Sequence, residues 1–358
     1  MTKPKKKAMV ATWSDSNFFN DESNEGKVAN LCLTAFDEPK SSYVFASSAG
    51  TAPGKEAETL LKWKASVDNN TQTLLSSLWV GDSHCNWVGI TCNKAGSITN
   101  LSLPDCGFKV SLGNPFSDSL IKSLEWISLA ENEITGPIPA SVGSLHYLSK
   151  LYLKRNRLSG SIPEQVCSLS KLTELDFSQN NFSRNIPSNI GRLLSSLSQL
   201  ILKANNLTGP IPISIGSMHN LSRLVLVENR LNVSIPKEVG MMRSLVILDL
   251  SVNYLTGPIP PSLGNLSNLV WLYLYGNNLP GSIPNEIGQL GSLTTMQLSS
   301  NNLAGVIPTS IGNLTKSSSL YLFENKLSRS IPQEVGMLVS LIELILSDNN
   351  FSGSILLP

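Results

Sequence analysis

The sequence of 358 residues has little of what most enzymes use for chemistry. It holds three histidines and five cysteines, and it contains neither a Cys-x-x-Cys pair nor a His-Glu-x-x-His motif. It also lacks the Gly-x-Gly-x-x-Gly phosphate loop, the Gly-x-Ser-x-Gly nucleophile elbow and the His-Arg-Asp and Asp-Phe-Gly tripeptides of protein kinases. We therefore expect no catalytic residue, no metal and no cofactor.

Charge is also scarce. Charged residues make up 15% of the chain, against roughly 25% in typical soluble domains. The 27 basic and 26 acidic residues nearly cancel, which argues against a nucleic-acid partner, because such proteins usually carry a strongly basic stripe. No apolar run approaches the roughly 18 residues that a membrane span requires, so we expect no span in this chain.

What the sequence has in abundance is a repeat. The pattern L-x-x-L-x-L-x-x-N-x-L-x-G-x-I-P-x-x-I-G-x-L begins at Leu124 and recurs every 24 residues, with one step of 25 between Leu172 and Leu197. The L-x-L portion predicts a strand whose leucines point inward and whose other residues point to solvent. One such coil cannot bury its own leucines, so successive coils must stack.

Two further features of the repeat are predicted to be structural. An asparagine follows each strand, and a buried amide there can satisfy backbone groups that the turn leaves unpaired. This ladder comprises Asn132, Asn156, Asn180, Asn205, Asn229, Asn253, Asn277, Asn301, Asn325 and Asn349. A glycine then precedes the Ile-Pro step, and because Arg184, Val233 and Arg329 replace it in three copies, we expect those coils to differ locally.

The L-x-G-x-I-P wording resembles the leucine-rich repeat of plant receptor-like kinases and receptor-like proteins, over residues 98–358. The resemblance implies an α/β repeat solenoid of about ten to eleven repeats: a curved right-handed superhelix with a parallel β-sheet on its concave side. By the same resemblance, the chain is the ectodomain of a cell-surface receptor, at the plasma membrane or outside the cell.

An amino-terminal cap is expected over residues 51–97. Residues 56–67 read as an amphipathic helix, and the segment from Cys85 to Cys92 resembles the paired-cysteine cap of the same plant proteins. The resemblance implies a disulfide between these two cysteines, in a compartment that permits one; two free buried thiols are the alternative. Cys106 and Cys167 are expected to be packed free thiols.

The two ends of the chain depart from that family. Residues 1–50 show no periodicity, lack the apolar segment of a secretory signal, and are expected to be disordered. Residues 1–45 resemble a plant copia-type retrotransposon polyprotein, which raises the alternative of a fused gene model without function. We expect the last repeat to be truncated at Pro358, and the sequence contains neither a membrane helix nor a kinase after it.

Function is expected on the concave face, where we predict non-catalytic recognition of a peptide ligand or a protein co-receptor, as a monomer or a ligand-induced heteromer. The candidate residues are Tyr152, Lys154, Trp271, Tyr273, Tyr275, Tyr321 and Phe323. The alternative for the aromatic side chains is that they pack on their neighbours in the sheet. The alternative for the whole chain is a secreted protein similar to polygalacturonase inhibitors.

Asn-x-Ser/Thr sequons are frequent and mildly favour glycosylation in a secretory compartment. They lie at Asn69, Asn100, Asn181, Asn206, Asn220, Asn232, Asn265, Asn313 and Asn350. The repeat wording itself generates several of them.

Overall fold

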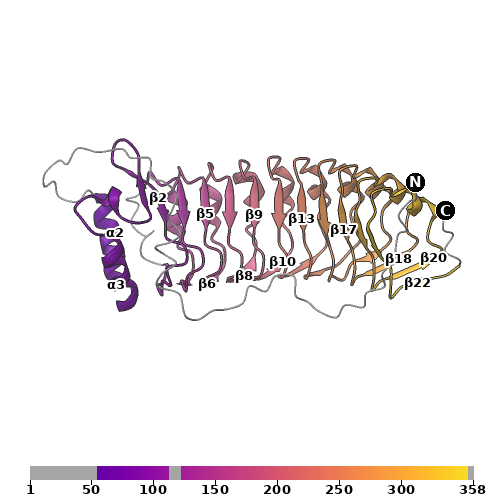
Figure 1. Ribbon diagram of the computed structural model, residues 1–358, viewed down its shortest axis with the longest axis horizontal. Coiled ribbons are helices and arrows are strands. Elements are labelled where there is room, and N and C mark those ends of the chain that lie inside the picture. The colour runs from indigo at the N-terminus through magenta and orange to yellow at the C-terminus, as the bar shows by residue number, and fades with distance from the viewer. Residues whose placement is uncertain (1–54, 113–121, 354–358) are drawn as a thin grey trace, which may run out of the picture.

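The computed structural model describes residues 55–112 and 122–353, which form one elongated stack of coils with two helices at its amino-terminal end (Figure 1). The segments predicted to be disordered or transposon-like, 1–50 and 1–45, lie outside the described residues. The predicted leucine-rich repeat solenoid is confirmed.

The main sheet has twelve strands, and each coil contributes one of them. Its strands are β1 (Ile90–Cys92), β2 (Ile98–Ser102), β3 (Trp126–Ser128), β5 (Lys150–Tyr152), β7 (Glu174–Asp176), β9 (Gln199–Ile201), β11 (Arg223–Val225), β13 (Ile247–Asp249), β15 (Trp271–Tyr273), β17 (Thr295–Gln297), β19 (Ser319–Tyr321) and β21 (Glu343–Ile345). Strand β1 is antiparallel to β2, and all later neighbours are parallel. Because the repeat is constant, Leu224 pairs with Leu248 and Leu248 with Leu272, so the inward leucines form one continuous buried core.

Each coil returns through a second short strand, and these strands form two smaller sheets. One holds β4 (Thr135–Gly136), β6 (Arg157–Gly160), β8 (Asn181–Asn185), β10 (Asn206–Gly209), β12 (Arg230–Val233) and β14 (Tyr254–Leu255). The other holds β16 (Pro280–Gly281), β18 (Asn302–Gly305), β20 (Lys326–Arg329) and β22 (Asn350–Phe351). The break falls at Pro280, because proline has no N–H to donate to the preceding coil.

The convex side is built from short 3-10 helices rather than α-helices. They are η2 (Ala140–Ser144), η3 (Glu164–Ser168), η4 (Ile213–Ser217), η5 (Lys237–Met241), η6 (Pro261–Asn265), η7 (Asn285–Gln289), η8 (Thr309–Asn313) and η9 (Gln333–Met337). The coil with the extra residue instead forms α4 (Ile190–Leu193). A glycine in these helices, except in η3 where Cys167 takes its place, lets the next coil approach. A Cβ on Gly240, for example, would lie 2.2 Å from the Ser262 carbonyl oxygen.

The asparagine ladder holds the coils together by hydrogen bonds. In each of the ten copies the side-chain carbonyl accepts from a backbone N–H of the preceding coil, and the amide donates to backbone carbonyls. For Asn253, Oδ1 accepts from the Leu231 N–H at 2.9 Å, and Nδ2 donates to the carbonyls of Leu226, Leu250 and Ser251. The backbone N–H and carbonyl groups that the turn leaves without backbone partners are thereby hydrogen-bonded.

The cap covers the first coil with two helices. α2 (Lys55–Ser66) buries Ala57, Leu60 and Trp63, and Glu56 accepts from the Ile98 N–H and from the Ser123 hydroxyl. The second helix, α3 (Asn69–Leu78), was not predicted. Its start is fixed by Asp68, whose carboxylate accepts from two backbone N–H groups of the first turn.

The end of the cap is tied by a disulfide. A short 3-10 helix, η1 (His84–Asn86), leads to β1, and Cys85 is bonded to Cys92 with their Cα atoms 5.5 Å apart. Cys167 is a buried free thiol, as expected. Cys106 is disulfide-bonded, so the prediction of a free thiol there was wrong.

The three replacements of the turn glycine do not change its backbone. Arg184, Val233 and Arg329 have φ values of 66°, 71° and 64°, in the same left-handed region as Gly257 at 76°. Stacking against identical coils imposes the conformation even on Val233, for which the branched Cβ makes it unfavourable. The expected local difference in the turn is therefore absent at these positions.

Candidate binding surface

The concave face is made of the outward side chains of β3 to β21 and of the residue that follows each inward leucine. Because side chains alternate along a strand, Trp271 and Tyr273 of β15 and Tyr275 share one side, opposite Leu272 and Leu274, which are fully buried. The predicted candidates therefore lie on one surface. They fall into two groups, one on β5 near the cap and one on β15 to β19.

The aromatic group lies toward the carboxy-terminal half. Trp271 is 38% exposed, and Tyr273, Tyr275, Tyr321 and Phe323 are half-buried. These residues come from two coils, those of β15 and β19, which are separated in the sheet by β17. Their rings therefore form two separate apolar groups along the concave face.

The tyrosine hydroxyls are held by their neighbours. Tyr321 donates to Glu343 of β21 at 2.5 Å, and the side chains of Tyr275 and Ser251 are hydrogen-bonded. Burial raises the pKa of both Tyr273 and Tyr275, so they are neutral at physiological pH. Lateral hydrogen bonding of these hydroxyls thus coexists with partial exposure of their rings.

The group near the cap is charged and lies at a hollow. The hollow has a volume of about 360 Å³, and its floor and walls comprise Tyr152, Lys154, Glu174, Leu175, Asp176, Gln199, Ile201 and Arg223. Only Tyr152 and Lys154 were among the predicted site residues. The others lie on the next three strands, β7, β9 and β11. All except the inward-facing Leu175 occupy the first or third position of a strand, at the spacing of 24 or 25 residues that the repeat already contains.

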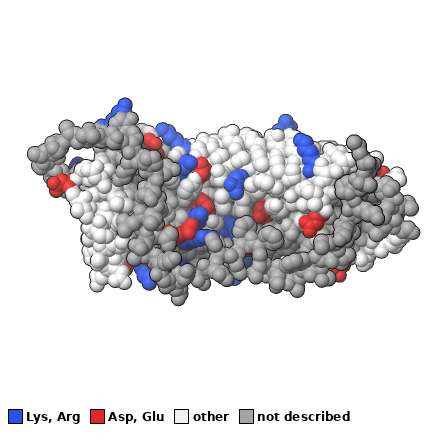
Figure 2. Space-filling model, in the orientation of Figure 1, with Lys and Arg blue, Asp and Glu red and all other residues white. Residues whose placement is uncertain are grey.

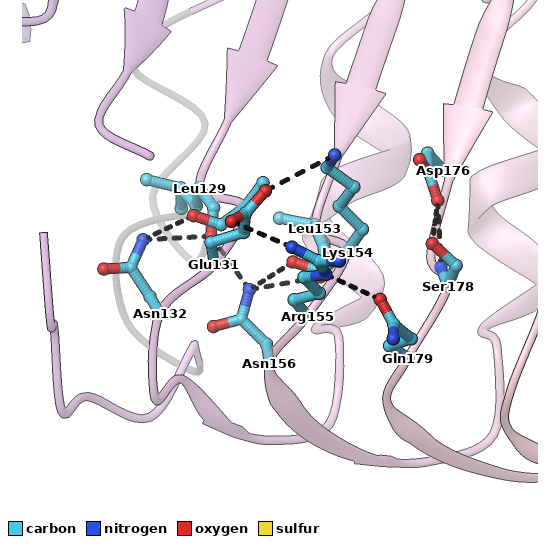
Figure 3. A network of polar contacts seen from close by, with 11 residues as sticks. Leu129, Glu131, Asn132, Leu153, Lys154, Arg155, Asn156, Asp176, Ser178 and Gln179 are labelled. Carbon is cyan, nitrogen blue, oxygen red and sulfur yellow. Dashed lines mark hydrogen bonds and ion pairs between the residues drawn. The ribbon is translucent and has the colours of Figure 1, made fainter. Parts of the chain in front are cut away.

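Ion pairs and hydrogen bonds join the side chains around the hollow from coil to coil (Figure 3). Arg155 donates to Glu131 at 3.2 Å and to Gln179 at 2.8 Å, and Lys154 pairs with Glu131 at 3.4 Å. In Figure 2 acidic and basic side chains interleave over this part of the solenoid, whereas only isolated charges appear toward the carboxy-terminal end.

Glu174 is the centre of a second charged contact. Its carboxylate pairs with Lys150 at 2.9 Å and accepts a hydrogen bond from the Tyr152 hydroxyl. Burial alone would raise the pKa of Glu174, but these two donors outweigh it and hold the pKa below its usual range. Burial and the same carboxylate raise the pKa of Tyr152. Glu174 is therefore ionised and Tyr152 neutral over the physiological range.

The sequon asparagines avoid most of the concave face. Eight of them are exposed, on the second strands, the convex 3-10 helices, the loop before β11 or the start of α3: Asn69, Asn181, Asn206, Asn220, Asn232, Asn265, Asn313 and Asn350. The ninth, Asn100, is half-buried in β2 of the main sheet. No sequon asparagine lies on strands β3 to β21.

None of the described helices is long and apolar enough to cross a membrane. Among the described residues, the concave face brings together no His, Cys, Asp or Glu cluster with metal-ligand geometry. The face carries charged side chains at one end and aromatic rings at the other.

Known protein families match both parts of the chain. The leucine rich repeat N-terminal domain matches residues 53–93, and the leucine rich repeat matches residues 123–145, 147–169, 171–193, 244–266, 268–290 and 292–314. A probable leucine-rich repeat receptor-like protein kinase of Arabidopsis thaliana is 42% identical over 106 residues, which is 27% of this chain and 9% of the relative. The chain is homologous to plant leucine-rich repeat receptor kinases.

Solved structures of such receptors resemble this chain in fold. The PEPR1–AtPEP1 complex has 33% identity and a TM-score of 0.70, over 83% of this chain and 45% of that one. The Arabidopsis receptor kinase HAESA, in complex with the peptide hormone IDA and the co-receptor SERK1, has 28% identity and a TM-score of 0.70, over 83% and 54%. These comparisons match the receptor interpretation and not the polygalacturonase-inhibitor alternative.

The matched part of this chain covers 9% of the length of that receptor kinase. The matched portion is the repeat-containing ectodomain, and no kinase domain is detected in this chain.

Proposed function

We propose that this chain recognises an extended peptide, or an extended segment of a co-receptor, along its concave face at the cell surface. The observation that carries the proposal is the arrangement of that face: partly exposed aromatic rings on the coils of β15 and β19, and a charged hollow on β5 to β11. Partly exposed aromatic side chains give large contact area at a low entropy cost.

The solved complexes of similar receptors support the choice of ligand class. HAESA is in complex with a peptide hormone and a co-receptor, and PEPR1 is in complex with AtPEP1. The sequon pattern also agrees, because glycans at the eight exposed asparagines would leave strands β3 to β21 uncovered. Glycosylation at these eight, and weaker or no occupancy at half-buried Asn100, is part of the proposal.

A peptide-display selection tests the proposal, because the selection itself identifies the peptides that bind. Random peptides of about twelve residues, long enough to cross several coils, are selected on the purified full chain, and the affinities of the enriched sequences are measured by calorimetry. The Tyr273→Ala/Tyr275→Ala double variant should weaken binding by at least about tenfold, or about 1.4 kcal/mol.

Tyr254→Ala is the matched control, because Tyr254 is 57% exposed but lies on β14, outside the main sheet. It should leave affinity unchanged. If the enriched peptides bind the double variant as tightly as the native chain, or if Tyr254→Ala weakens them equally, the concave face is not the recognition surface.

Glycosylation is tested separately. The chain is produced with a secretory leader in plant cells, and site occupancy is measured by mass spectrometry of its tryptic glycopeptides. Occupancy at the exposed asparagines with little at Asn100 is expected. Unmodified asparagines in protein that has passed through the secretory pathway would contradict the predicted modification.

A further inference from the structure

Two departures from the repeat occur on neighbouring second strands, outside the main sheet. The residue that follows the ladder asparagine is charged or is itself an asparagine in every copy except one, where Tyr254 begins β14. The third residue after the ladder asparagine is Ser, Thr, Pro or Ala in every copy except one, where it is Asn232 of β12. The two exceptions lie in adjacent coils.

The structure places these two residues side by side. Asn232 and Tyr254 are partners in the parallel pairing of β12 with β14, and neighbouring strands of a sheet stand about 4.8 Å apart. Leu231 and Leu255, the next residues along the two strands, are fully buried. Because side chains alternate along a strand, Asn232 and Tyr254 both point away from the core.

The surface around Asn232 is apolar. Tyr254 is 57% exposed, Val233 is 52% exposed, and Val252, in the bend before β14, is 41% exposed. Exposed apolar side chains that are grouped in this way indicate a contact surface. The sequon formed by Asn232, Val233 and Ser234 is exposed at all three residues. The attachment point of a glycan therefore lies within this apolar patch of Val233, Val252 and Tyr254.

We propose that the first N-acetylglucosamine of a glycan on Asn232 packs on the ring of Tyr254. The inference rests on the glycosylation proposed above and adds to it a contact within the chain. Glycosylation forms a bond between the asparagine Nδ2 and C1 of the sugar; the amide gives up one proton, and the lipid-linked diphosphate of the sugar donor leaves.

The chemistry of the two groups favours this contact. The first sugar is joined directly to Nδ2, so it begins beside the ring of the paired strand rather than at the end of a flexible chain. The C–H bonds of the sugar carry a weak positive charge, and the face of an aromatic ring is negative. Packing would cover apolar surface that is otherwise exposed to water, and it would hold β12 against β14.

The other sequon asparagines on second strands lack an aromatic partner in register. Each of them is exposed and pairs with a serine of the preceding coil. The pairs are Asn181 with Ser159, Asn206 with Ser183 and Asn350 with Ser328. Asn206 of β10 is therefore the matched control site, because its glycan has no ring in register to cover.

The test observes the sugar directly. The full chain is produced with a secretory leader in cells that make only high-mannose glycans, and an endoglycosidase trims each glycan to its first sugar. Mass spectrometry of tryptic glycopeptides gives the occupancy of Asn232. The C–H signals of the retained, carbon-13-labelled sugars are then recorded by NMR, and those missing in Asn232→Gln are assigned to that site.

Packing on an aromatic face should move these proton signals upfield through the ring current. Tyr254→Ala should abolish the upfield shift, and Tyr254→Phe, which keeps the ring, should retain it. The signals that disappear in Asn206→Gln belong to the control site, and they should be the same in the native chain and in Tyr254→Ala.

Hydrogen exchange gives a second readout at the strand pair. The Thr256 N–H donates to the Val233 carbonyl at 2.7 Å, between β14 and β12. In the glycosylated chain, Asn232→Gln and Tyr254→Ala should each speed exchange of this amide about threefold, as expected for the loss of one aromatic contact. The two changes together should do little more than either alone, and Asn206→Gln should leave the rate unchanged.

The outcomes separate the contact from the glycosylation on which it rests. An unmodified Asn232 in secreted protein would contradict the glycosylation and the contact together. A modified Asn232 whose sugar signals are the same in the native chain and in Tyr254→Ala would overturn the contact alone. Dimers of the Asn232→Gln chain that Tyr254→Ala dissociates, detected by light scattering, would assign the apolar patch to a second molecule of this chain instead of the sugar.

Discussion

Replacing one ladder asparagine in the middle of the stack is expected to destabilise several coils together. In Asn253→Ala, the Leu231 N–H loses its acceptor, and the carbonyls of Leu226, Leu250 and Ser251 lose a donor. Asn253 is 6% exposed, so water cannot readily replace the missing amide.

The expected loss follows from these four contacts. A buried N–H left without a partner costs about 2 kcal/mol, within the 1–3 kcal/mol range for unsatisfied groups. Carbonyl oxygens keep a second lone pair and often another donor, so we assign the three together about 2 kcal/mol. The total is about 4 kcal/mol, a large share of the stability of an ordinary domain.

The measurement is chemical denaturation combined with hydrogen exchange at the Leu231 amide. Asn349→Ala is the matched control, because Asn349 makes the same contacts but is only half-buried in the last described coil. Water should replace much of its amide, and the loss should stay near about 1 kcal/mol. Equal losses for the two variants, or unchanged exchange at Leu231, would refute the assignment of this stability to buried ladder bonds.

Three further predictions follow from single positions. Gly191→Ala should lower the free energy of unfolding by about 3 kcal/mol, because the new Cβ would lie 1.7 Å from the Ser214 carbonyl oxygen. In the control Gly291→Ala, the new Cβ would have nothing within 4 Å, and the free energy of unfolding should change by less than about 0.5 kcal/mol. Ser317→Ala should stabilise by about 1 kcal/mol in the same denaturation assay, because it removes a buried hydroxyl without a hydrogen-bond partner; a loss of stability would contradict this. Burial raises the pKa of Asp249, so its ionised form opposes folding above that pKa; Asp249→Asn should therefore stabilise at pH 7, and the gain measured in a pH series should shrink as pH falls through the raised pKa.

The repeat made most of the fold predictable from the sequence. A constant period fixes which leucines stack, and the pairing of Leu224 with Leu248 and Leu272 follows from counting alone. The ladder asparagines were predictable for the same reason. Where a repeat dominates, each coil's conformation is set by its neighbours more than by its own residues, which explains why Val233 keeps the left-handed turn that we expected it to disturb.

What was missed depends on contacts between coils rather than within them. The charged hollow requires Lys154, Glu174 and Arg223 from three different coils. Lys154 was predicted, but the sequence pattern presents Glu174 and Arg223 as ordinary exposed residues. Helix α3 has few apolar residues, Leu74, Leu75 and Leu78, among many Asn, Thr and Ser residues, and its start depends on the Asp68 cap. The disulfide-bonded state of Cys106 gives no local signal, since that residue occupies a ladder position like any asparagine.

The spacing of the two parts of the concave face sets a minimum length for a ligand that uses both. From β5 at the hollow to β19 at Tyr321 the sheet has seven strand-to-strand steps, which at about 4.8 Å each span about 34 Å. An extended peptide covers that distance with about ten residues at roughly 3.4 Å per residue. Twelve-residue peptides selected on the chain should therefore lose affinity when cut to either half, and each half should respond to only one of two variants, Lys154→Ala at the hollow or Tyr321→Ala on β19. Halves that bind as tightly as the whole peptide would show that one end of the face suffices, because a ligand confined to one end gains nothing from contacts about 34 Å away.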